Sequence, residues 1–350
     1  MSILIYGATG YSGRLIAQRA VELGMALVLA GRNGAAVRQL ATSLGVPARV
    51  FPLDSGSAIR GALDGVDTVV HAVGLFSSTS APMLDACLAS GTHYIDITGE
   101  ALVFEAIAAR DAEAEAAGIV MLPGAGFDVV PSDCLAAHVK RRLPGAVSLR
   151  IGIAGVGGIS RGTARTMVEG LGRGTLVRRD GRIVELKDTP RAMIDFGRGR
   201  RPATGVSWGD VSTAWHSTGI PDIGVFFATP RRASAVLRVL RVVRPLLATA
   251  PTQRVLKALV QQRSEGPDAD TRARGRSIIV AEAWDAAGNH VASRLETMEA
   301  YQLTAATAVD IARRVSAGTV GPGFHTPSSA FGADFILDFG ANRTDMSNDK

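Results

Sequence analysis

The chain has 350 residues, which is long enough for two domains, and 47% of them are hydrophobic, so each domain can bury a core. The net charge of +6 favours an anionic partner, either a small molecule or a carrier-bound substrate. Nucleic acid is not expected, because the basic residues are scattered and an aromatic content of 5% is too low for a base-stacking surface.

Strands and helices are predicted to alternate over residues 1–145. Short apolar runs predict strands at 3–6, 26–30, 49–53, 68–73, 93–97 and 119–122. Helical spacing of apolar residues predicts helices at 13–23, 37–44, 82–89 and 101–117. Apolar strands that alternate with helices are typical of a parallel sheet covered on both faces. With right-handed crossovers, this segment is predicted to be a Rossmann-type, doubly wound α/β domain.

The alternation ends after Pro144, and residues 146–299 are predicted to form a mixed α+β domain for substrate binding and dimerisation. A homodimer is therefore expected. Asp180-Gly181 and the turn 285–289, each between two strand-like runs, predict β-hairpins. A helix at 304–317 precedes GPGFHTP, which is predicted to be a loop because of its glycines and prolines. The segment of about 300–340 is expected to pack back on the first domain.

A basic stretch, Arg231–Arg244, carries arginines between valines and leucines. We interpret it as a surface helix with a solvated basic face, and the alternative is an interfacial helix in peripheral contact with a membrane or an acidic carrier. No apolar run reaches the length of about 18 residues that a membrane span needs, and the chain opens directly into a strand. A cytoplasmic location is expected.

Two cysteines, Cys87 and Cys134, fall in expected helices without metal-ligand spacing, and no metal site is predicted. We interpret both as small buried apolar residues in a reducing compartment. The alternative for Cys134 is a catalytic thiol.

The segment GATGYSGRL places three glycines between the first strand and the first helix. Gly7 permits a sharp turn out of the strand, Gly10 permits backbone to approach a pyrophosphate, and Gly13 permits the helix to pack close to the sheet. The N–H groups of the helix N-terminus then point at the phosphates. The residues expected to contact the cofactor here are Gly7, Thr9, Gly10, Tyr11, Ser12 and Gly13.

Arg32 follows the second strand, nineteen residues after Gly13. NAD-preferring domains usually carry an acidic residue at this strand end, whereas an arginine pairs with the 2′-phosphate. NADP(H) is therefore predicted over NAD(H), and an exposed helix-capping residue is the alternative for Arg32. Asn33 and Asp54 are expected beside the adenine half. The segment AVGLFS is expected to pass toward the nicotinamide with Val73, Gly74 and Phe76.

Three segments in order, GATGYSGRL, VVHAVGLFSSTSAPMLDACLASGTHYIDITGE and PGAGFDVVPSD, resemble the saccharopine dehydrogenase-like NADP-binding oxidoreductases. Later pieces, including WHSTGIPDIGVF and GPGFHTPSSAFG, extend the resemblance over nearly the whole chain. It is closest to trans-acting enoyl reductase-like and uncharacterised members. The resemblance implies NADP binding and reduction of an imine, as in saccharopine-forming enzymes, or of a C=C bond, as in enoyl reductases.

The chain departs from the saccharopine-forming enzymes in its lysines. Those enzymes are expected to use a lysine near the nicotinamide, whereas this chain has only Lys140, Lys187, Lys257 and Lys350. None of these follows a strand of the first domain. The lysine content thus favours a C=C substrate over an imine.

Hydride reduction also needs a proton donor. Three candidates are Asp96, in YIDITGE, Asp128, in PGAGFDVVPSD, and His216, in WHSTGIP. Histidine is the natural acid–base residue at neutral pH, which favours His216, and Asp128 could act if burial raised its pKa. The alternatives for Asp96 are capping the entry of the helix from Ala101 or holding the loop, and the alternative for His216 is a core histidine. Glu100 is expected to complement the dipole of the helix that follows it.

These observations predict an NADPH-dependent oxidoreductase that reduces a polarised double bond, with the enoyl C=C of a small or lipid-like substrate favoured. An imine reductase of the saccharopine dehydrogenase type is the first alternative. The second is a non-catalytic NADP-binding sensor or membrane-surface scaffold.

Overall fold

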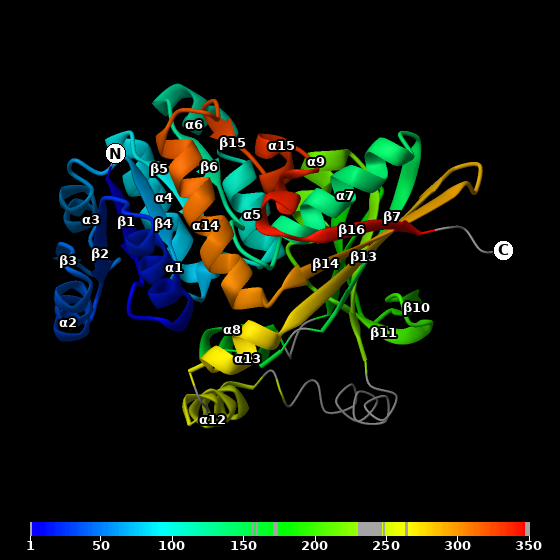
Figure 1. The fold of residues 1–350 in the computed structure, drawn as a ribbon, viewed down its shortest axis with the longest axis horizontal. Helices are drawn as coiled ribbons and strands as arrows, with labels where there is room; N and C mark the ends of the chain where they lie inside the picture. The colour runs from blue at the N-terminus through cyan, green and yellow to red at the C-terminus, as the bar shows by residue number, and fades with distance from the viewer. Residues whose placement is uncertain are drawn as a thin grey trace. The chain divides into compact units, whose positions relative to one another are not determined.

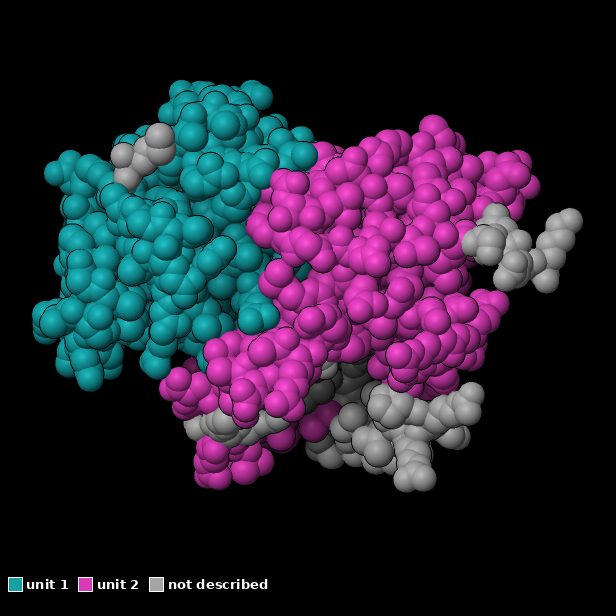
Figure 2. Space-filling model, in the orientation of Figure 1, with its two compact units in different colours: residues 1–130, 300–331 teal, residues 131–299, 332–350 magenta. Residues whose placement is uncertain are grey.

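The computed structural model describes residues 2–155, 157–158, 160–170, 174–229, 247, 249–262 and 265–346. The stretch Arg231–Arg244 lies outside these residues. The chain divides into two compact units (Figure 2). Unit 1 comprises residues 1–130 and 300–331, and unit 2 comprises residues 131–299 and 332–350. Each unit has a sheet of its own.

Unit 1 is built on a sheet whose described strands run in the order β15-β6-β5-β4-β1-β2-β3, with every pairing parallel (Figure 1). The strands are β1 (Ile3–Tyr6), β2 (Leu27–Gly31), β3 (Ala48–Val50), β4 (Thr68–His71), β5 (His93–Asp96), β6 (Val120–Leu122) and β15 (Gly323–Phe324). β1 lies between β2 and β4, with Ile3 opposite both Leu27 and Thr68. Chain order therefore reverses at β1, and the predicted Rossmann-type α/β fold is confirmed.

Two groups of helices pack on this sheet. α1 (Tyr11–Glu22) lies along α14 (Ala300–Ser316), and both contact strands of the sheet (Figure 1). The second group consists of α4 (Phe76–Ser90) and the helices that it contacts, which are α3 (Gly56–Ala62), α5 (Ala101–Ala108) and α6 (Asp111–Ala117). The remaining described helices of unit 1 are α2 (Gly34–Leu44) and α15 (Pro327–Phe331).

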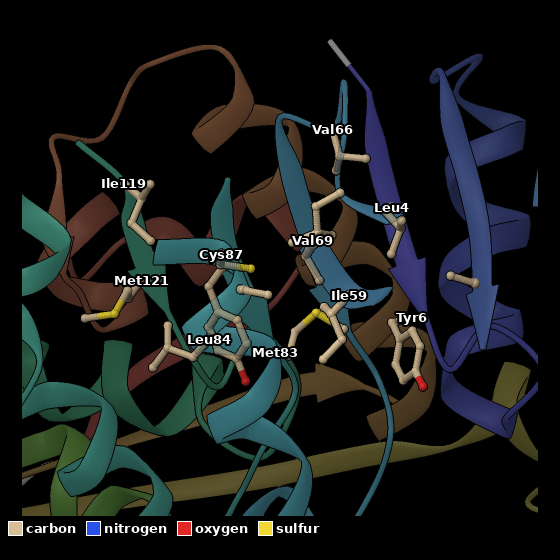
Figure 3. Close-up of a cluster of buried hydrophobic side chains, with 14 of the residues drawn as sticks. Leu4, Tyr6, Ile59, Val66, Val69, Met83, Leu84, Cys87, Ile119 and Met121 are labelled. Atoms are coloured by element: carbon tan, nitrogen blue, oxygen red, sulfur yellow. The ribbon is translucent and has the colours of Figure 1, made fainter. Parts of the chain in front are cut away.

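The core beneath α4 follows from the period-two alternation of the strands. Leu4 and Tyr6 of β1 and Val69 of β4 lie on one face of the sheet, and they gather with Met83 and Cys87 of α4 (Figure 3). All five side chains are almost completely buried. The alternate residues of the strands face the opposite side.

The prediction of a single helix at 101–117 is wrong. The structure breaks it into α5 and α6 at Ala109–Arg110. Asp111 and Glu113 lie in the first turn of α6, where acidic side chains favour a new helix N-terminus. Arg110 pairs there with both Glu113 and Asp85 of α4, which fixes the break.

The prediction that GPGFHTP is entirely loop is also wrong. Gly323 and Phe324 form β15, a two-residue strand beside β6. The Gly323 N–H donates to the carbonyl of Ile119 (2.9 Å), and the Phe324 N–H donates to Oδ1 of Asp111 (2.6 Å). β15 lies at the edge of the sheet and pairs with β6 on one side only, so a strand of two residues is enough to form this pairing.

Unit 2 contains a mixed sheet with the path β10-β11-β12-β7-β13-β14-β16, from which β8 and β9 branch at β12. Its strands are β7 (Ala146–Ala154), β8 (Thr175–Arg179), β9 (Arg182–Leu186), β10 (Arg191–Asp195), β11 (Arg200–Val206), β12 (Asp222–Ala228), β13 (Arg276–Asp285), β14 (His290–Met298) and β16 (Asn342–Met346). β12 and β7 are parallel, and the other described pairs are antiparallel.

Both predicted hairpins of unit 2 are confirmed, as β8–β9 and β13–β14. Asp180 and Gly181 both have positive φ, at 48° and 74°, as a tight hairpin turn demands. The described helices of this unit are α7 (Val130–Arg142), α8 (Arg161–Gly170), α9 (Asp210–Thr218), α12 (Ala250–Gln261), α13 (Ala269–Arg274) and the 3₁₀ turn η1 (Phe335–Phe339).

Candidate functional site

The glycine loop after β1 folds tightly against its own helix. Gly7 has a φ of +87°, and its carbonyl oxygen accepts the N–H of Gly10 at 2.9 Å. A Cβ on Gly13 would overlap that same oxygen, so α1 approaches the strand end only because residue 13 is glycine. Gly10 is exposed and occupies the N-cap of α1, and as a glycine it has no side chain to cap the helix. The loop therefore presents a bare helix N-terminus at the carboxyl edge of the sheet, which suits a pyrophosphate.

The other loop residues lie at its surface. Thr9, Tyr11 and Ser12 are partly buried. The Tyr11 ring packs edge-to-face on Tyr301 of α14, with ring centroids 4.9 Å apart. This contact ties the first turn of α1 to α14.

On the β2 side of the loop, charged residues stand at exposed strand ends. Arg32 follows β2 directly and Asp54 follows β3, and both are exposed. Burial raises the pKa of Tyr6 to about 12, while Arg32 lowers it and Asp54 raises it, so both charges lie near this phenol. Asn33 caps α2, since its Oδ1 accepts the N–H of Ala36 at 3.2 Å. The guanidinium of Arg32 therefore stands at the strand end where a 2′-phosphate is expected.

On the β4 side, the segment 72–77 makes a turn and then enters α4. Val73 packs against the glycine loop, because a Cβ on Gly7 would lie 2.6 Å from its Cγ2. Gly74 is exposed, and Leu75 has a φ of 61°. Phe76 is buried and begins α4, six residues before the predicted start at Pro82.

Asp96 is the last residue of β5, and its buried carboxylate accepts three hydrogen bonds. Its Oδ1 accepts the N–H groups of Thr98 and Gly124, both at 2.9 Å, and its Oδ2 accepts the hydroxyl of Tyr94 at 2.8 Å. Burial raises the pKa of the Asp96 carboxyl to about 6, although these donors favour the charged form. The side chain thus joins the ends of β5 and β6.

Asp128 lies beyond β6 and faces the loop that follows β5. A Cβ on Gly99 would lie 2.8 Å from its Oδ2, so glycine at position 99 makes room for the carboxylate. Burial raises the pKa of Asp128 to about 7. The structure therefore brings Asp96 and Asp128 to adjacent strand ends, and Asp128 can exchange a proton near neutral pH.

Glu100 does not serve the helix that sequence reasoning assigned to it. It precedes α5, yet its carboxylate reaches the N-terminus of α4, where Oε1 accepts the N–H of Phe76 (2.9 Å) and Oε2 that of Ser77 (3.1 Å). The expectation that it complements α5 is wrong for this reason. No local pattern could reveal the contact, because it joins residues 24 positions apart.

His216 belongs to unit 2, on the last turn of α9, and is exposed. The alternative of a core histidine is therefore wrong. Its neighbour Ser217 donates to Oδ1 of Asp133 at 2.7 Å, which links α9 to α7 within that unit. Of the three proton-donor candidates, unit 1 holds Asp96 and Asp128, and unit 2 holds His216.

Both cysteines are buried, as predicted. Burial raises the pKa of the Cys134 thiol well above its usual range, which disfavours the thiolate that a catalytic thiol requires. The described residues contain no group of three or more His, Cys, Asp or Glu side chains able to hold a metal ion. Among the described helices, none combines the length and the apolar character that crossing a membrane requires.

Unit 1 combines a parallel sheet that reverses at β1, a glycine loop at the reversal and an arginine after β2. These features define a dinucleotide-binding domain. Residues 3–122 match the family model described as "Saccharopine dehydrogenase NADP binding domain". The resemblance to the saccharopine dehydrogenase-like proteins is thus confirmed for the nucleotide-binding segment of residues 3–122.

Related sequences carry enoyl reductase names. A trans-acting enoyl reductase of Mycobacterium leprae is 33% identical over 150 residues, which cover 40% of this chain and 36% of the relative. A putative trans-acting enoyl reductase of Mycobacterium tuberculosis is 32% identical over 181 residues, which cover 48% of this chain and 43% of the relative. The chain therefore matches less than half the length of either relative.

Solved structures share the fold over the whole chain. Apo saccharopine dehydrogenase (L-Glu forming) of Saccharomyces cerevisiae has a TM-score of 0.62 at 14% identity, covering 99% of this chain and all of the other. Homospermidine synthase of Legionella pneumophila in complex with NAD has a TM-score of 0.63 at 11% identity, covering 100% and 93%. At these identities the likeness shows the fold alone.

Proposed function

We propose that the protein is an NADPH-dependent oxidoreductase that reduces a polarised double bond. The observation that carries this proposal is a carboxyl group with a pKa near 7, that of Asp128, at the same sheet edge as a glycine loop built for pyrophosphate. The family model matched by residues 3–122 supports the dinucleotide, and the enoyl reductase names of the relatives support the type of reaction.

The residues of unit 1 fit an NADP cofactor. Gly10 leaves an exposed backbone at the start of α1, where the pyrophosphate would bind. Arg32 would pair with the 2′-phosphate, and Asp54 would flank the adenine. Bound NADPH supplies a hydride from C4 of its nicotinamide.

Asp128 is the candidate proton donor in unit 1. Burial raises the pKa of its carboxyl to about 7, so near neutral pH it can release a proton to a substrate atom that gains negative charge. Asp96 holds the ends of β5 and β6 through three hydrogen bonds, which suits a positioning role better than proton transfer. His216 stays a second candidate from unit 2.

An enoyl C=C bond is favoured over an imine. The four lysines of the chain all fall outside unit 1, so this unit cannot supply the lysine expected of saccharopine-forming enzymes. The relatives' enoyl reductase names point the same way. The net charge of +6 supports an anionic substrate, free or carrier-bound. A homodimer and a peripheral membrane contact stay predictions.

The test is NADPH oxidation by the purified protein over a panel of enoyl thioesters and imines. We expect saturable NADPH binding, weaker NADH binding and turnover with an enoyl substrate. Turnover with imines alone would select the alternative substrate class. NADPH binding without any turnover, together with flotation on anionic liposomes, would select the non-catalytic scaffold.

A further inference from the structure

We propose that Glu100 is a positioning residue for the nicotinamide half of the dinucleotide, acting through the turn Val73–Leu75. The proposal rests on the proposed function, because it assumes that a dinucleotide binds at the glycine loop. Its carboxylate clamps the first two amides of α4 and so fixes the start of that helix directly after the turn.

The turn contains a strained residue. The backbone of Leu75 adopts the left-handed conformation, with φ 61° and ψ 55°. Residues other than glycine, asparagine and aspartate rarely adopt this conformation. Such strain persists only where the surroundings over-determine it, and it concentrates at ligand clamps and active sites. A leucine held in this state next to the glycine loop therefore indicates a functional demand on the backbone of the turn.

Helix α4 holds Leu75 from the C-terminal side. The Leu75 carbonyl accepts the backbone N–H groups of Ser78 (2.9 Å) and Thr79 (3.2 Å), and the Ser78 hydroxyl also donates to it (3.0 Å). Glu100 adds two charge-assisted bonds to the intervening amides of Phe76 and Ser77. Every amide from 76 to 79 is thus engaged, and removal of the Glu100 carboxylate releases the two nearest to Leu75.

His71 supports the turn from inside the core. Its ring is fully buried against Tyr6, Phe76 and Tyr94, and its Nε2 lies 3.0 Å from Oγ1 of Thr79. Nδ1 has no hydrogen-bond partner among the described residues, so we assign the proton to Nε2, which donates to Thr79. The Thr79 hydroxyl keeps its own hydrogen for the carbonyl of Val73 or Leu75.

The strand order places this turn on the nicotinamide side. The glycine loop follows β1, Arg32 follows β2 on one side of it, and the turn follows β4 on the other. A dinucleotide with its pyrophosphate at the loop and its 2′-phosphate at Arg32 must extend its other half toward β4. The turn also packs against the loop, since a Cβ on Gly7 would lie 2.6 Å from Cγ2 of Val73.

The test compares Glu100→Ala and Glu100→Gln with Glu113→Ala, which removes an exposed glutamate that pairs with Arg110 on α6. Dissociation constants are measured by fluorescence titration with NADPH and NADH, and by competition with 2′,5′-ADP, which lacks the nicotinamide half. We expect Glu100→Ala to weaken NADPH and NADH by the same factor, about tenfold, and to leave 2′,5′-ADP unchanged. Glu100→Gln keeps one acceptor and should fall between, and Glu113→Ala should match the wild type.

A rescue experiment separates positioning from general destabilisation. Glycine adopts the left-handed conformation without penalty, whereas alanine does not. Leu75→Gly combined with Glu100→Ala should therefore recover most of the lost NADPH affinity, while Leu75→Ala combined with Glu100→Ala should not. The two double variants differ only in the Cβ that alanine keeps, so the comparison reports mainly on the backbone conformation at position 75. Circular dichroism checks that each variant folds; if Glu100→Ala alone does not, Glu100→Gln with and without Leu75→Gly provides the same comparison.

The outcomes separate the two proposals. A wild-type protein that binds no NADPH overturns the proposed function and this inference with it. A wild-type protein that binds NADPH, with Glu100→Ala equal to it, overturns only the role of Glu100. So does an equal loss of 2′,5′-ADP affinity, or the same recovery from Leu75→Gly and Leu75→Ala.

Discussion

The two sides of β1 in unit 1 differ in how their polar residues are held. On the β2–β3 side, Arg32 and Asp54 stand exposed at strand ends. On the β4–β6 side, Asp96 is fully buried with three donors, and Glu100 spans two amides of another helix. At the carboxyl ends of one sheet, the β2–β3 side thus carries exposed charges, and the β4–β6 side carries polar groups held by hydrogen bonds.

This difference separates selectivity from chemistry. Exposed charges select a ligand in water, where each contributes modestly and can change without disturbing the core. Buried groups have shifted pKa values and fixed positions, as proton transfer requires, and their removal leaves partners unsatisfied. Substitutions on the β4–β6 side should therefore cost more than those on the β2–β3 side.

The largest effect is expected from Asp128→Asn. It keeps the shape of the side chain against Gly99 but cannot release a proton, so turnover should fall roughly 100- to 10,000-fold while NADPH affinity stays unchanged. Wild-type turnover should decline as the pH rises above about 7, because the carboxyl then loses its proton. NADPH oxidation over a pH series measures both, with Asp85→Asn on the surface of α4 as the control. Unchanged turnover would transfer the role to His216.

Asp128→Asn should also change the pH dependence of stability, which can be measured without a substrate. Burial raises the pKa of Asp128 from 3.8 to about 7, so between these values the folded protein retains a proton that the unfolded chain has released. Wild-type stability therefore falls through this range, and its loss is complete above about pH 7. Asp128→Asn lacks this loss and should gain stability over the wild type from pH 4 to pH 7, as measured by urea denaturation. A stability difference that does not change with pH would contradict the raised pKa.

The next largest effect is expected at Asp96. Asp96→Ala leaves the N–H groups of Thr98 and Gly124 and the hydroxyl of Tyr94 without their buried acceptor, and it should lower the free energy of unfolding by about 3 kcal/mol or more. Asp96→Asn retains one acceptor oxygen for the two amides and should lose only about 1 kcal/mol. Denaturant unfolding at pH 8, where the carboxyl is charged, measures both. Equal losses would show that the hydrogen bonds of Asp96 are not its main contribution.

The two sides also differ in how far sequence reasoning predicted them. The glycine loop depends on a local rule, namely glycine at a tight turn between a strand and a helix, and it appears where expected. The hairpin at Asp180-Gly181 follows for the same reason.

The β4–β6 side depends on contacts between residues distant in the chain. Glu100 caps α4 rather than α5, and this cap lets α4 begin at Phe76 instead of Pro82. The left-handed Leu75 cannot be anticipated, because leucine has no preference for that state. The raised pKa of Asp128 depends on burial that only the folded chain provides.

A smaller effect is expected from Arg32→Ala, on the exposed side. Loss of a charge-assisted contact to a phosphate should weaken NADPH binding about 10- to 100-fold, whereas NADH, which has no 2′-phosphate, should change less than about threefold. Fluorescence titration of both cofactors measures the ratio. Arg19→Ala, which removes a surface arginine paired with Glu22 on α1, is the control. An equal loss for both cofactors would contradict the role of Arg32 in selecting NADP.

The smallest effect is expected at Asn33, where capping and charge can be separated. Asn33→Ala removes the acceptor for the Ala36 N–H and should cost about 1 kcal/mol of stability, with little change in cofactor preference. Asn33→Asp restores the acceptor and the stability, but it adds a negative charge beside Arg32, so NADPH affinity should fall relative to NADH. Thermal unfolding and paired titrations distinguish the two effects. An unchanged ratio of NADPH to NADH affinity in Asn33→Asp would show that charges on the β2–β3 side do not determine cofactor preference. The proposed division between selectivity on this side of β1 and chemistry on the other would then be wrong.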